Sequence, residues 1–228
     1  MGLPAPPDLV IFDCDGVLID SEILYCRIDA EEFTRAGYPI TPAEVARRFV
    51  GTSYDTMLKI IAEERGQPLP DEVTVRVNER VAEVIPAELK AVRGIAGLLD
   101  RIGVPVCVAS NTATERLRWN LEVVGLLARF DPHVYSARMV ARGKPAPDLF
   151  WHAARQFEIP PERCLVIEDS AVGVGAAVAA GMPVLGFVAG EHCWPELEDQ
   201  LRAAGAFDVA STSERIDEIL AKAAVGRA

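Results

Sequence analysis

The chain has 228 residues, of which half are hydrophobic and a quarter are charged, an ordinary composition for a folded globular protein. This length allows one core domain and a smaller insert, and such a chain can bury a core without disulfides. Its formal net charge of −11 repels nucleic-acid backbones and anionic lipid surfaces, so we expect no nucleic-acid partner and no membrane partner.

The amino-terminal residues 1–8 lack the basic and apolar regions of a signal peptide. No apolar stretch is long and unbroken enough to predict a membrane-spanning helix. The five cysteines include no CxxC pair, and Cys107 and Cys164 lie inside apolar runs, where cysteine usually serves as a small core residue. These features predict a protein of the reducing cytoplasm without a disulfide framework.

Short apolar runs bounded by turn residues predict buried parallel strands. They are Leu9–Phe12, Val104–Ala109, Leu165–Ile167 and Val184–Val188. Helical patterns alternate with them, at Gly94–Arg101, Thr114–Leu127, Pro147–Gln156 and Val172–Gly181. This alternation predicts an α/β fold with a Rossmann-like, doubly wound parallel sheet and right-handed crossovers.

The stretch 20–88 departs from this alternation because its pattern is helical throughout. The expected helices are Ser21–Ala36, Thr41–Val50, Tyr54–Arg65 and Asp71–Val84. We therefore expect a core domain made of residues 1–19 and 89–228, with 20–88 inserted as an all-helical cap domain. Since ligands bind outside the carboxyl ends of the strands in open α/β sheets, an insert that leaves the first strand at that end would cover the site as a lid.

The first strand is followed by the acidic sequence Asp13-Cys14-Asp15-Gly16. Alternate side chains of an extended chain share a face, so Asp13 and Asp15 would point the same way. Two such carboxylates can bind a hard cation and divide the chemistry between a nucleophile and a general acid–base group. A pair of solvated turn aspartates is the ordinary alternative, and for an isolated DxD sequence it is the favoured one.

Polar side chains also follow the later strands. Ser110 and Asn111 precede a helix and could bind an anion there, or Ser110 or Thr112 could simply cap the helix. Lys144 lies between a glycine and two prolines, and it could be a fixed cation or a solvated surface lysine. Either Glu168 or Asp169 could complete a magnesium site with the first two aspartates, or Asp169 or Ser170 could simply cap the next helix. Each signal is weak alone, but together they predict one site at one edge of the sheet.

As an ordered set, these motifs resemble those of the haloacid dehalogenase superfamily, in its phosphoglucomutase-like branch with a helical cap after the first strand. The matching segments span nearly the whole chain: Asp13–Val17, Ser110–Asn111, Gly143–Asp148 and Glu168–Gly173. The dehalogenases that named the superfamily lack an acid at the position of Asp15. The resemblance therefore favours phosphoryl chemistry over carbon–halogen cleavage.

The resemblance implies a role for each matching residue. Asp13 would attack phosphorus and become a transient aspartyl phosphate, and Asp15 would protonate the leaving oxygen and then activate water. Ser110 and Asn111 would hold the phosphoryl oxygens, and Lys144 would offset the negative charge of nucleophile and phosphate. A Mg²⁺ cofactor is implied as well. Its ligands would be Asp13, the backbone carbonyl of Asp15, Asp169 and, directly or through water, Glu168.

Phosphomutases of the β-phosphoglucomutase type hold a second phosphate, with a histidine in the first cap helix and an arginine in the cap's specificity loop. Alignment from the DxD motif puts Tyr25 at the histidine position and Tyr54 at the arginine position. A tyrosine cannot supply the cation that a second phosphate needs. We therefore expect hydrolysis of a small phosphorylated metabolite, with a phosphomutase as the alternative. A catalytically silent binding protein is a further alternative, against which the complete motif set argues.

The segments Asp13–Glu22 and Arg48–Gly51 are similar to those of bacterial sugar phosphatases, 6-phosphogluconate phosphatases among them. This resemblance implies a sugar phosphate or a phosphosugar acid as substrate. The candidate specificity residues all lie in the expected cap: Glu22, Arg47, Arg48, Thr52 and Ser53. Each of them is as readily explained as a solvated helix or loop residue. Nothing in the sequence indicates the oligomeric state.

Overall fold

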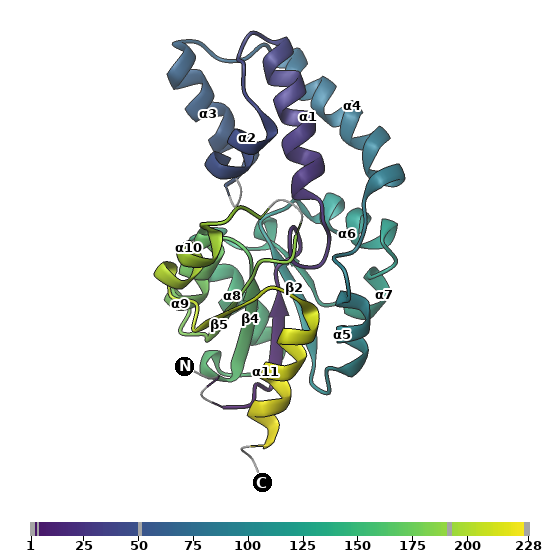
Figure 1. Cartoon of the computed structure of the whole chain (residues 1–228), viewed down its shortest axis with the longest axis vertical. Coiled ribbons are helices and arrows are strands. Elements are labelled where there is room, and N and C mark those ends of the chain that lie inside the picture. Colours follow the sequence, from purple (N-terminus) through teal and green to yellow (C-terminus); the bar gives the residue numbers. More distant parts are fainter. Residues whose placement is uncertain (1–2, 4, 50–51, 191–192, 226–228) are drawn as a thin grey trace.

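The computed structural model of the chain describes residues 3, 5–49, 52–190 and 193–225 (Figure 1). In these residues the sheet has six strands, all parallel, in the order β3-β2-β1-β4-β5-β6. They are β1 (Leu9–Phe12), β2 (Val106–Ser110), β3 (Val134–Ser136), β4 (Cys164–Glu168), β5 (Val184–Phe187) and β6 (Asp208–Ala210). The Rossmann-like doubly wound sheet is therefore confirmed. The sequence analysis missed β3 and β6, and the expected start of β2 was two residues early.

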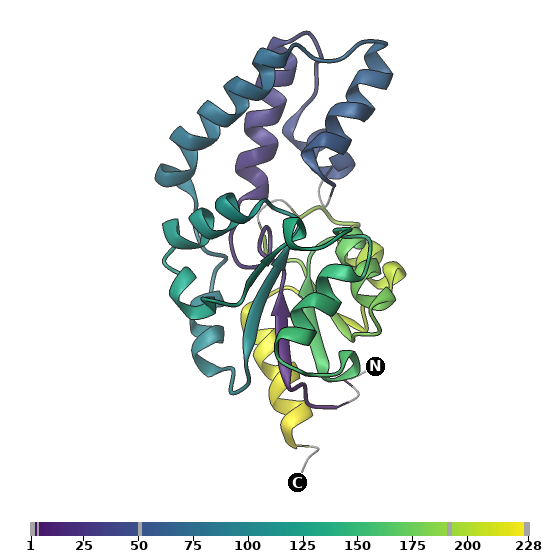
Figure 2. The same cartoon turned by 180° about the vertical axis from the view of Figure 1, so that it is seen from behind.

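Both faces of the sheet are buried. Along β1, Val10 and Phe12 pack into one apolar cluster, whereas Leu9 and Ile11 pack into the other. The first face is covered by α5 (Ile95–Arg101), α6 (Thr114–Val123), α7 (Leu127–Phe130) and α11 (Ser213–Val225). The opposite face is covered by α8 (Asp148–Gln156), α9 (Ala171–Ala179) and α10 (Leu197–Ala204). Figure 2 shows the molecule from the side opposite to that of Figure 1, with the second group of helices in view. The arrangement is a three-layer α/β/α sandwich.

The helix expected over Thr114–Leu127 is two helices instead of one. The chain turns at Gly125, whose φ of 72° lies in the left-handed region that glycine adopts without strain. This residue ends α6, and α7 starts two residues later. Short 3₁₀ turns, η1 (Ala137–Met139) and η2 (Pro161–Arg163), complete the described elements of the core.

The helical insert follows β1 and contains α1 (Glu22–Arg35), α2 (Pro42–Phe49), α3 (Tyr54–Arg65) and α4 (Asp71–Glu88). Apolar side chains from α1, α3 and α4 are buried between the helices, as Phe33, Ile61 and Val73 illustrate. The start of α2 has a capping box, since the backbone N–H of Glu44 donates to the Thr41 hydroxyl and the Thr41 N–H donates to the Glu44 carboxylate. The expected helix end at Val50 lies outside the described residues.

The chain enters and leaves the insert through two adjacent segments. The N–H of Asp20 donates to the carbonyl of Lys90 over 2.9 Å, and the N–H of Val92 donates to the carbonyl of Leu18 over 3.0 Å. Ile19 and Ala91 form an antiparallel bridge between these bonds. This pairing fixes the insert above the carboxyl ends of the strands, as both ribbon views show. None of the described helices is long and apolar enough to cross a bilayer.

Candidate active site

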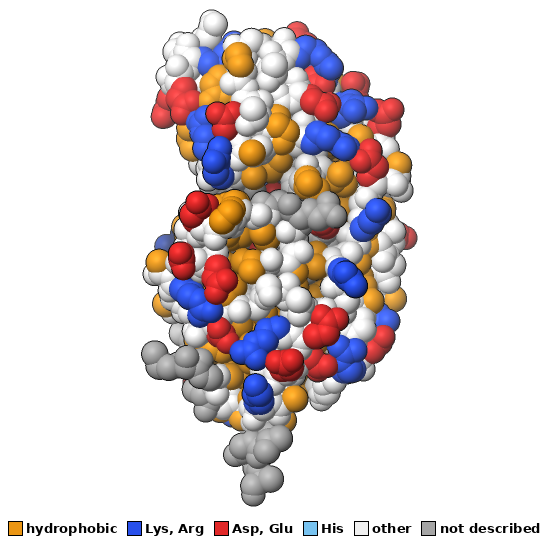
Figure 3. All heavy atoms as spheres, in the orientation of Figure 1, with side chains coloured by type: hydrophobic (Ala, Val, Ile, Leu, Met, Phe, Trp, Pro, Cys, Tyr) orange, Lys and Arg blue, Asp and Glu red, His pale blue; other side chains and the backbone are white. Residues whose placement is uncertain are grey.

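A cleft of about 440 Å³ separates the helical insert from the carboxyl ends of the strands. Figure 3 shows the molecular surface hollowed at this level, where the insert meets the core. The core residues that the sequence analysis singled out all line the cleft: Asp13, Asp15, Ser110, Asn111, Lys144, Glu168 and Asp169. They come from β1, β2, β4 and the loop before α8, which are far apart in the chain and meet at one sheet edge.

Lys144 lies between two acids. Its Nζ is 2.5 Å from Oδ1 of Asp13 and 2.6 Å from Oε1 of Glu168, and all three side chains are buried. Burial alone would lower the pKa of the lysine, but the charges of Asp13 and Glu168 outweigh it and raise that pKa above its ordinary value. Burial raises the pKa of Asp13, and the attraction of Lys144 opposes this effect. The ammonium is thus held in its charged form beside the nucleophile candidate.

Asp15 is held by two hydroxyl groups. The Ser21 hydroxyl donates to its Oδ1 over 2.6 Å, and the Thr112 hydroxyl donates to its Oδ2 over 2.7 Å. The Ser110 hydroxyl lies at the limit of hydrogen bonding, 3.5 Å from Oδ2. The turn after Asp15 is tight because Gly16 has a φ of 81°. These contacts fix the carboxyl group of Asp15 at the cleft, two residues beyond Asp13.

The side chain of Asn111 positions the loop that carries Lys144. Its Oδ1 accepts from the backbone N–H of Lys144 over 2.9 Å, and its Nδ2 donates to the carbonyl of the same residue over 3.1 Å. Gly143 lies against this pair, since an added Cβ would come within 2.6 Å of the Asn111 Oδ1. The side chain of Asn111 is therefore engaged in supporting the lysine, and its backbone N–H is the group that it can offer to an anion.

Glu168 is fixed at both carboxylate oxygens. Oε1 faces Lys144, whereas Oε2 accepts from the backbone N–H groups of Asp169 and Ser170 and from the Ser170 hydroxyl, all within 3.1 Å. The same hydroxyl accepts from the N–H of Gly173 and caps α9. Because both of its carboxylate oxygens are engaged, Glu168 is better suited to orienting Lys144 than to binding a metal ion directly.

The donor set of the cleft fits a magnesium ion. Four carboxylates, from Asp13, Asp15, Glu168 and Asp169, line the cleft at the strand ends, and the Lys144 ammonium pairs with two of them, Asp13 and Glu168, so this acidic cluster carries excess negative charge when ionised. In the described part of the chain, no group of three or more acidic, cysteine or histidine side chains is arranged to hold an ion by itself. Mg²⁺ does not need such a cage, because it commonly takes one or two carboxylates and keeps several waters. Asp13, Asp169 and the backbone carbonyl of Asp15 are the groups suited to it.

The candidate specificity residues of the insert divide into two groups. Glu22, Thr52 and Ser53 line the cleft, although the Thr52 hydroxyl donates to the Phe49 carbonyl and the Ser53 hydroxyl caps α3. Arg47 and Arg48 do not line it, and both are exposed. The guanidinium of Arg48 lies 2.6 Å from the Glu64 carboxylate and donates to the Tyr38 hydroxyl, which turns it to the outside of the insert. Val50 and Gly51 lie outside the described residues.

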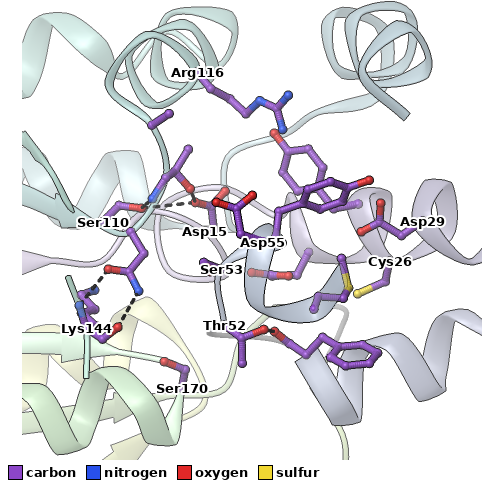
Figure 4. Close-up of a pocket in the computed structure, with 18 of the residues that line it drawn as sticks. Asp15, Cys26, Asp29, Thr52, Ser53, Asp55, Ser110, Arg116, Lys144 and Ser170 are labelled. Atoms are coloured by element: carbon purple, nitrogen blue, oxygen red, sulfur yellow. Dashed lines mark hydrogen bonds between the residues drawn. The ribbon is translucent and has the colours of Figure 1, made fainter. Parts of the chain in front are cut away.

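The cleft also contains charged residues that the sequence analysis missed. Arg138 from η1 lines it on the core side. Arg116 from α6 lines it on the core side as well, and Asp29 and Asp55 line it on the insert side (Figure 4). No motif marks these positions. The signal that could have found Arg116 is its place in the first turn of the helix that follows β2. Tyr25 and Tyr54 line the cleft as well. Among the described residues that line it, the cations are Lys144, Arg116 and Arg138, and all three belong to the core.

Comparison with known proteins gives the family of this chain. Residues 7–181 match the family model of haloacid dehalogenase-like hydrolases. The chain is 33% identical to the 6-phosphogluconate phosphatase of Escherichia coli (strain K12) over 189 residues, which cover 82% of this chain and 86% of that protein.

Solved structures agree with this match. A haloacid dehalogenase-like protein of unknown function from Agrobacterium tumefaciens is 38% identical, with a TM-score of 0.86 over 95% of this chain and 99% of that one. A HAD family hydrolase from Deinococcus radiodurans, with bound phosphate and sodium, is 33% identical, with a TM-score of 0.82 over 96% and 97% of the two chains. The chain therefore belongs to the haloacid dehalogenase-like hydrolases.

Proposed function

We propose that this hydrolase is a Mg²⁺-dependent phosphatase that acts on a small phosphorylated metabolite through an aspartyl phosphate on Asp13. The observation that carries the proposal is the position of Lys144, within 2.6 Å of both Asp13 and Glu168, beside an Asp15 held by two hydroxyls. A nucleophilic carboxylate, a fixed cation and a second acid in one cleft are what transfer of a phosphoryl group to an aspartate needs.

The first half of the reaction transfers the phosphoryl group. An Asp13 carboxylate oxygen attacks phosphorus, and the bond from phosphorus to the substrate oxygen breaks. Asp15 gives its proton to that leaving oxygen, so the product departs as an alcohol. Lys144 offsets the charge shared by Asp13 and the phosphoryl group. The backbone N–H of Asn111 and the hydroxyl of Ser110 are suited to the equatorial phosphoryl oxygens.

The second half releases phosphate. The Asp15 carboxylate takes a proton from a water molecule, whose oxygen attacks phosphorus as the bond to Asp13 breaks, giving inorganic phosphate and the original enzyme. Mg²⁺, held by Asp13, Asp169 and the carbonyl of Asp15, would supply further positive charge to the phosphoryl oxygens. Residues 20–88 would act as the cap that closes over the substrate and excludes bulk water.

We place the substrate among sugar phosphates and phosphosugar acids, and the enzyme in the cytoplasm. Support for the substrate class comes from the 33% identity with a 6-phosphogluconate phosphatase and from a cleft of a size typical for small ligands. Support for the location comes from the cysteines, of which Cys14, Cys26, Cys107 and Cys164 are free and buried.

A phosphomutase is the second candidate, favoured by the two arginines of the cleft. Arg116 and Arg138 could provide the cation for a second phosphate that Tyr25 and Tyr54 cannot. Product analysis separates the two activities, because a phosphatase releases inorganic phosphate and a mutase returns an isomeric phosphate ester.

The test is a phosphate-release assay with p-nitrophenyl phosphate and a panel of sugar phosphates and phosphosugar acids, with and without Mg²⁺. We expect Mg²⁺-dependent release that Asp13→Asn abolishes, and a phosphorylated Asp13 that mass spectrometry detects after rapid acid quenching. Full activity in Asp13→Asn would show that another group is the nucleophile. An inactive wild-type protein across the whole panel would favour the silent binding protein.

A further inference from the structure

Asp29 is an acid in the cleft that the proposed chemistry does not use. It lies on α1, lines the cleft from the insert side and has an exposed fraction of only 8% (Figure 4). Among the described residues, no hydrogen bond or ion pair is made by its carboxylate, although other buried acids of the insert such as Glu32 pair with arginines. A buried carboxylate without a partner costs stability, so its presence at a ligand cleft indicates that a ligand supplies the missing donor.

Arg116 is the complementary group. It reaches the cleft from α6, where its Nη2 donates to Oδ1 of Asn78 over 2.7 Å and its guanidinium lies 5.8 Å from the centre of the Tyr25 ring. Within the described ranges it makes no ion pair of 4 Å or less, unlike Arg76 or Arg163. Its charge nevertheless acts on Asp29, whose pKa it lowers against the larger, opposite effect of burial. A guanidinium in this position has N–H groups available to a ligand.

Together, Asp29 and Arg116 require a leaving group that carries both a hydrogen-bond donor and a hydrogen-bond acceptor. Asp29 accepts hydrogen bonds and Arg116 donates them, whereas Asn78 can do either. A purely anionic tail would satisfy Arg116 but would be repelled by Asp29. A hydroxylated carbon chain satisfies both, because each hydroxyl can donate to the acid while another oxygen of the chain accepts from the arginine. Val77 and Met57 line the same cleft and offer apolar contact to the carbon atoms.

We propose that Asp29, Arg116 and Asn78 form a subsite that selects a polyhydroxylated leaving group, with one hydroxyl donating to Asp29 and one oxygen accepting from Arg116. This inference rests on the proposed phosphatase function and specifies its substrate. Asp29 and Arg116 are specificity-determining residues in this account, because they contact the leaving group and not the reacting phosphorus. Neither residue was among the candidates taken from the sequence.

The test measures kcat/KM for a hexose 6-phosphate and for each of its single-deoxy analogues. In the wild type, removal of the hydroxyl that faces Asp29 should lower kcat/KM roughly 10- to 100-fold, the effect of a lost hydrogen bond to a charged group. Asp29→Leu removes the acceptor at similar volume, and this one penalty should then shrink to about twofold while the penalties at other positions stay. Asp29→Asn keeps a neutral acceptor and should retain part of the penalty.

The matched control is Glu31→Gln, an exposed position on the same helix that does not line the cleft; all penalties should stay as in the wild type. Arg116→Gln tests the second proposed contact, from Arg116 to an oxygen of the leaving group. A larger loss with a phosphosugar acid than with the sugar phosphate identifies a carboxylate at Arg116, whereas equal losses identify a neutral oxygen.

The contrary outcomes are distinct. A wild type that hydrolyses no phosphate ester overturns the proposed function and the subsite together. A wild type that hydrolyses all deoxy analogues equally well, or an Asp29→Leu variant that slows all analogues by one common factor, overturns the subsite alone. An Arg116→Gln variant without any loss removes Arg116 from it.

Discussion

Gly173 lies against the carboxylate of Glu168. A Cβ added to this glycine would come 1.8 Å from Oε1 of Glu168 and 2.0 Å from its carboxyl carbon. The carboxylate cannot easily move aside, because Lys144 binds one oxygen and the start of α9 binds the other. The first turn of α9 thus approaches the site so closely that only a residue without a side chain fits.

Gly173→Ala should therefore displace Glu168 and release Lys144 from its position. We expect a loss of stability of about 1–3 kcal/mol from overpacking and a fall in kcat of roughly 10- to 100-fold from the misplaced cation. Gly175→Ala is the matched control on the same helix, since an added Cβ meets no atom within 4 Å there. This control should be neutral or stabilising by up to about 1 kcal/mol. Denaturant unfolding and phosphatase kinetics measure both variants, and similar behaviour of the two would contradict the packing argument.

Ser21→Ala should impair the general acid without unfolding α1. The Ser21 hydroxyl donates to Asp15 and makes no side-chain cap to the helix, so the substitution removes only the contact to the acid. We expect kcat to fall roughly 10-fold for alkyl phosphates, whose leaving oxygen needs a proton, and much less for p-nitrophenyl phosphate, whose leaving group is already a good one. The ratio of the two kcat values is the measurement. An equal fall with both substrates would assign Ser21 a structural role instead.

The sequence predicted the architecture and the chemical centre because both depend on local patterns. Apolar runs located four strands, and motifs that follow strand ends necessarily meet in a parallel sheet. The strands β3 and β6 were missed because each is three residues long and lies at a sheet edge, where no long apolar run is needed. Gly125 divided a helix whose apolar pattern continued across the break.

The rest of the site could not be predicted because it depends on tertiary contacts. The sequence alone shows no partner for Arg48, but in the structure Glu64, sixteen residues later in the chain, binds it outside the cleft. Conversely, Asp29 has the sequence environment of a solvated helix residue and becomes a cleft residue only when α1 is placed above the sheet. Arg116 enters the site in the same way, through the position of α6.

Magnesium should stabilise the protein as well as activate it. A ligand that binds only the folded state adds about 2.7 kcal/mol to the free energy of unfolding when its concentration is one hundred times its dissociation constant. We therefore expect the melting temperature to rise with Mg²⁺ and to fall back when a chelator is added. Asp169→Asn should remove this increment, whereas Asp148→Asn, which affects an acid paired with Arg142 outside the cleft, should keep it. An increment that persists in Asp169→Asn would place the ion elsewhere.

Asp29→Asn should stabilise the protein at neutral and alkaline pH. Burial raises the pKa of Asp29 to about 7 in the folded protein, whereas in the unfolded chain it stays near its ordinary value of about 4. Between these two values the unfolded chain has released the proton and the folded protein has not, so rising pH favours unfolding. The wild type thus loses stability as the pH rises from about 4 to about 7, by at most roughly 4 kcal/mol, and asparagine removes this loss.

The neighbours of Asp29 do not titrate in the same pH range as Asp29. Burial raises the pKa of Tyr54, from α3, to about 12 with help from the charge of Asp29, and burial raises the pKa of the Cys26 thiol further above neutrality. The free energy of unfolding of Asp29→Asn minus that of the wild type should therefore increase from about pH 5 to about pH 8 and then level off. A difference that is constant over this range would mean that Asp29 is already ionised at pH 5 and accepts a hydrogen bond from a donor inside the protein. In that case there would be no reason to assign this donor to a hydroxyl of the substrate.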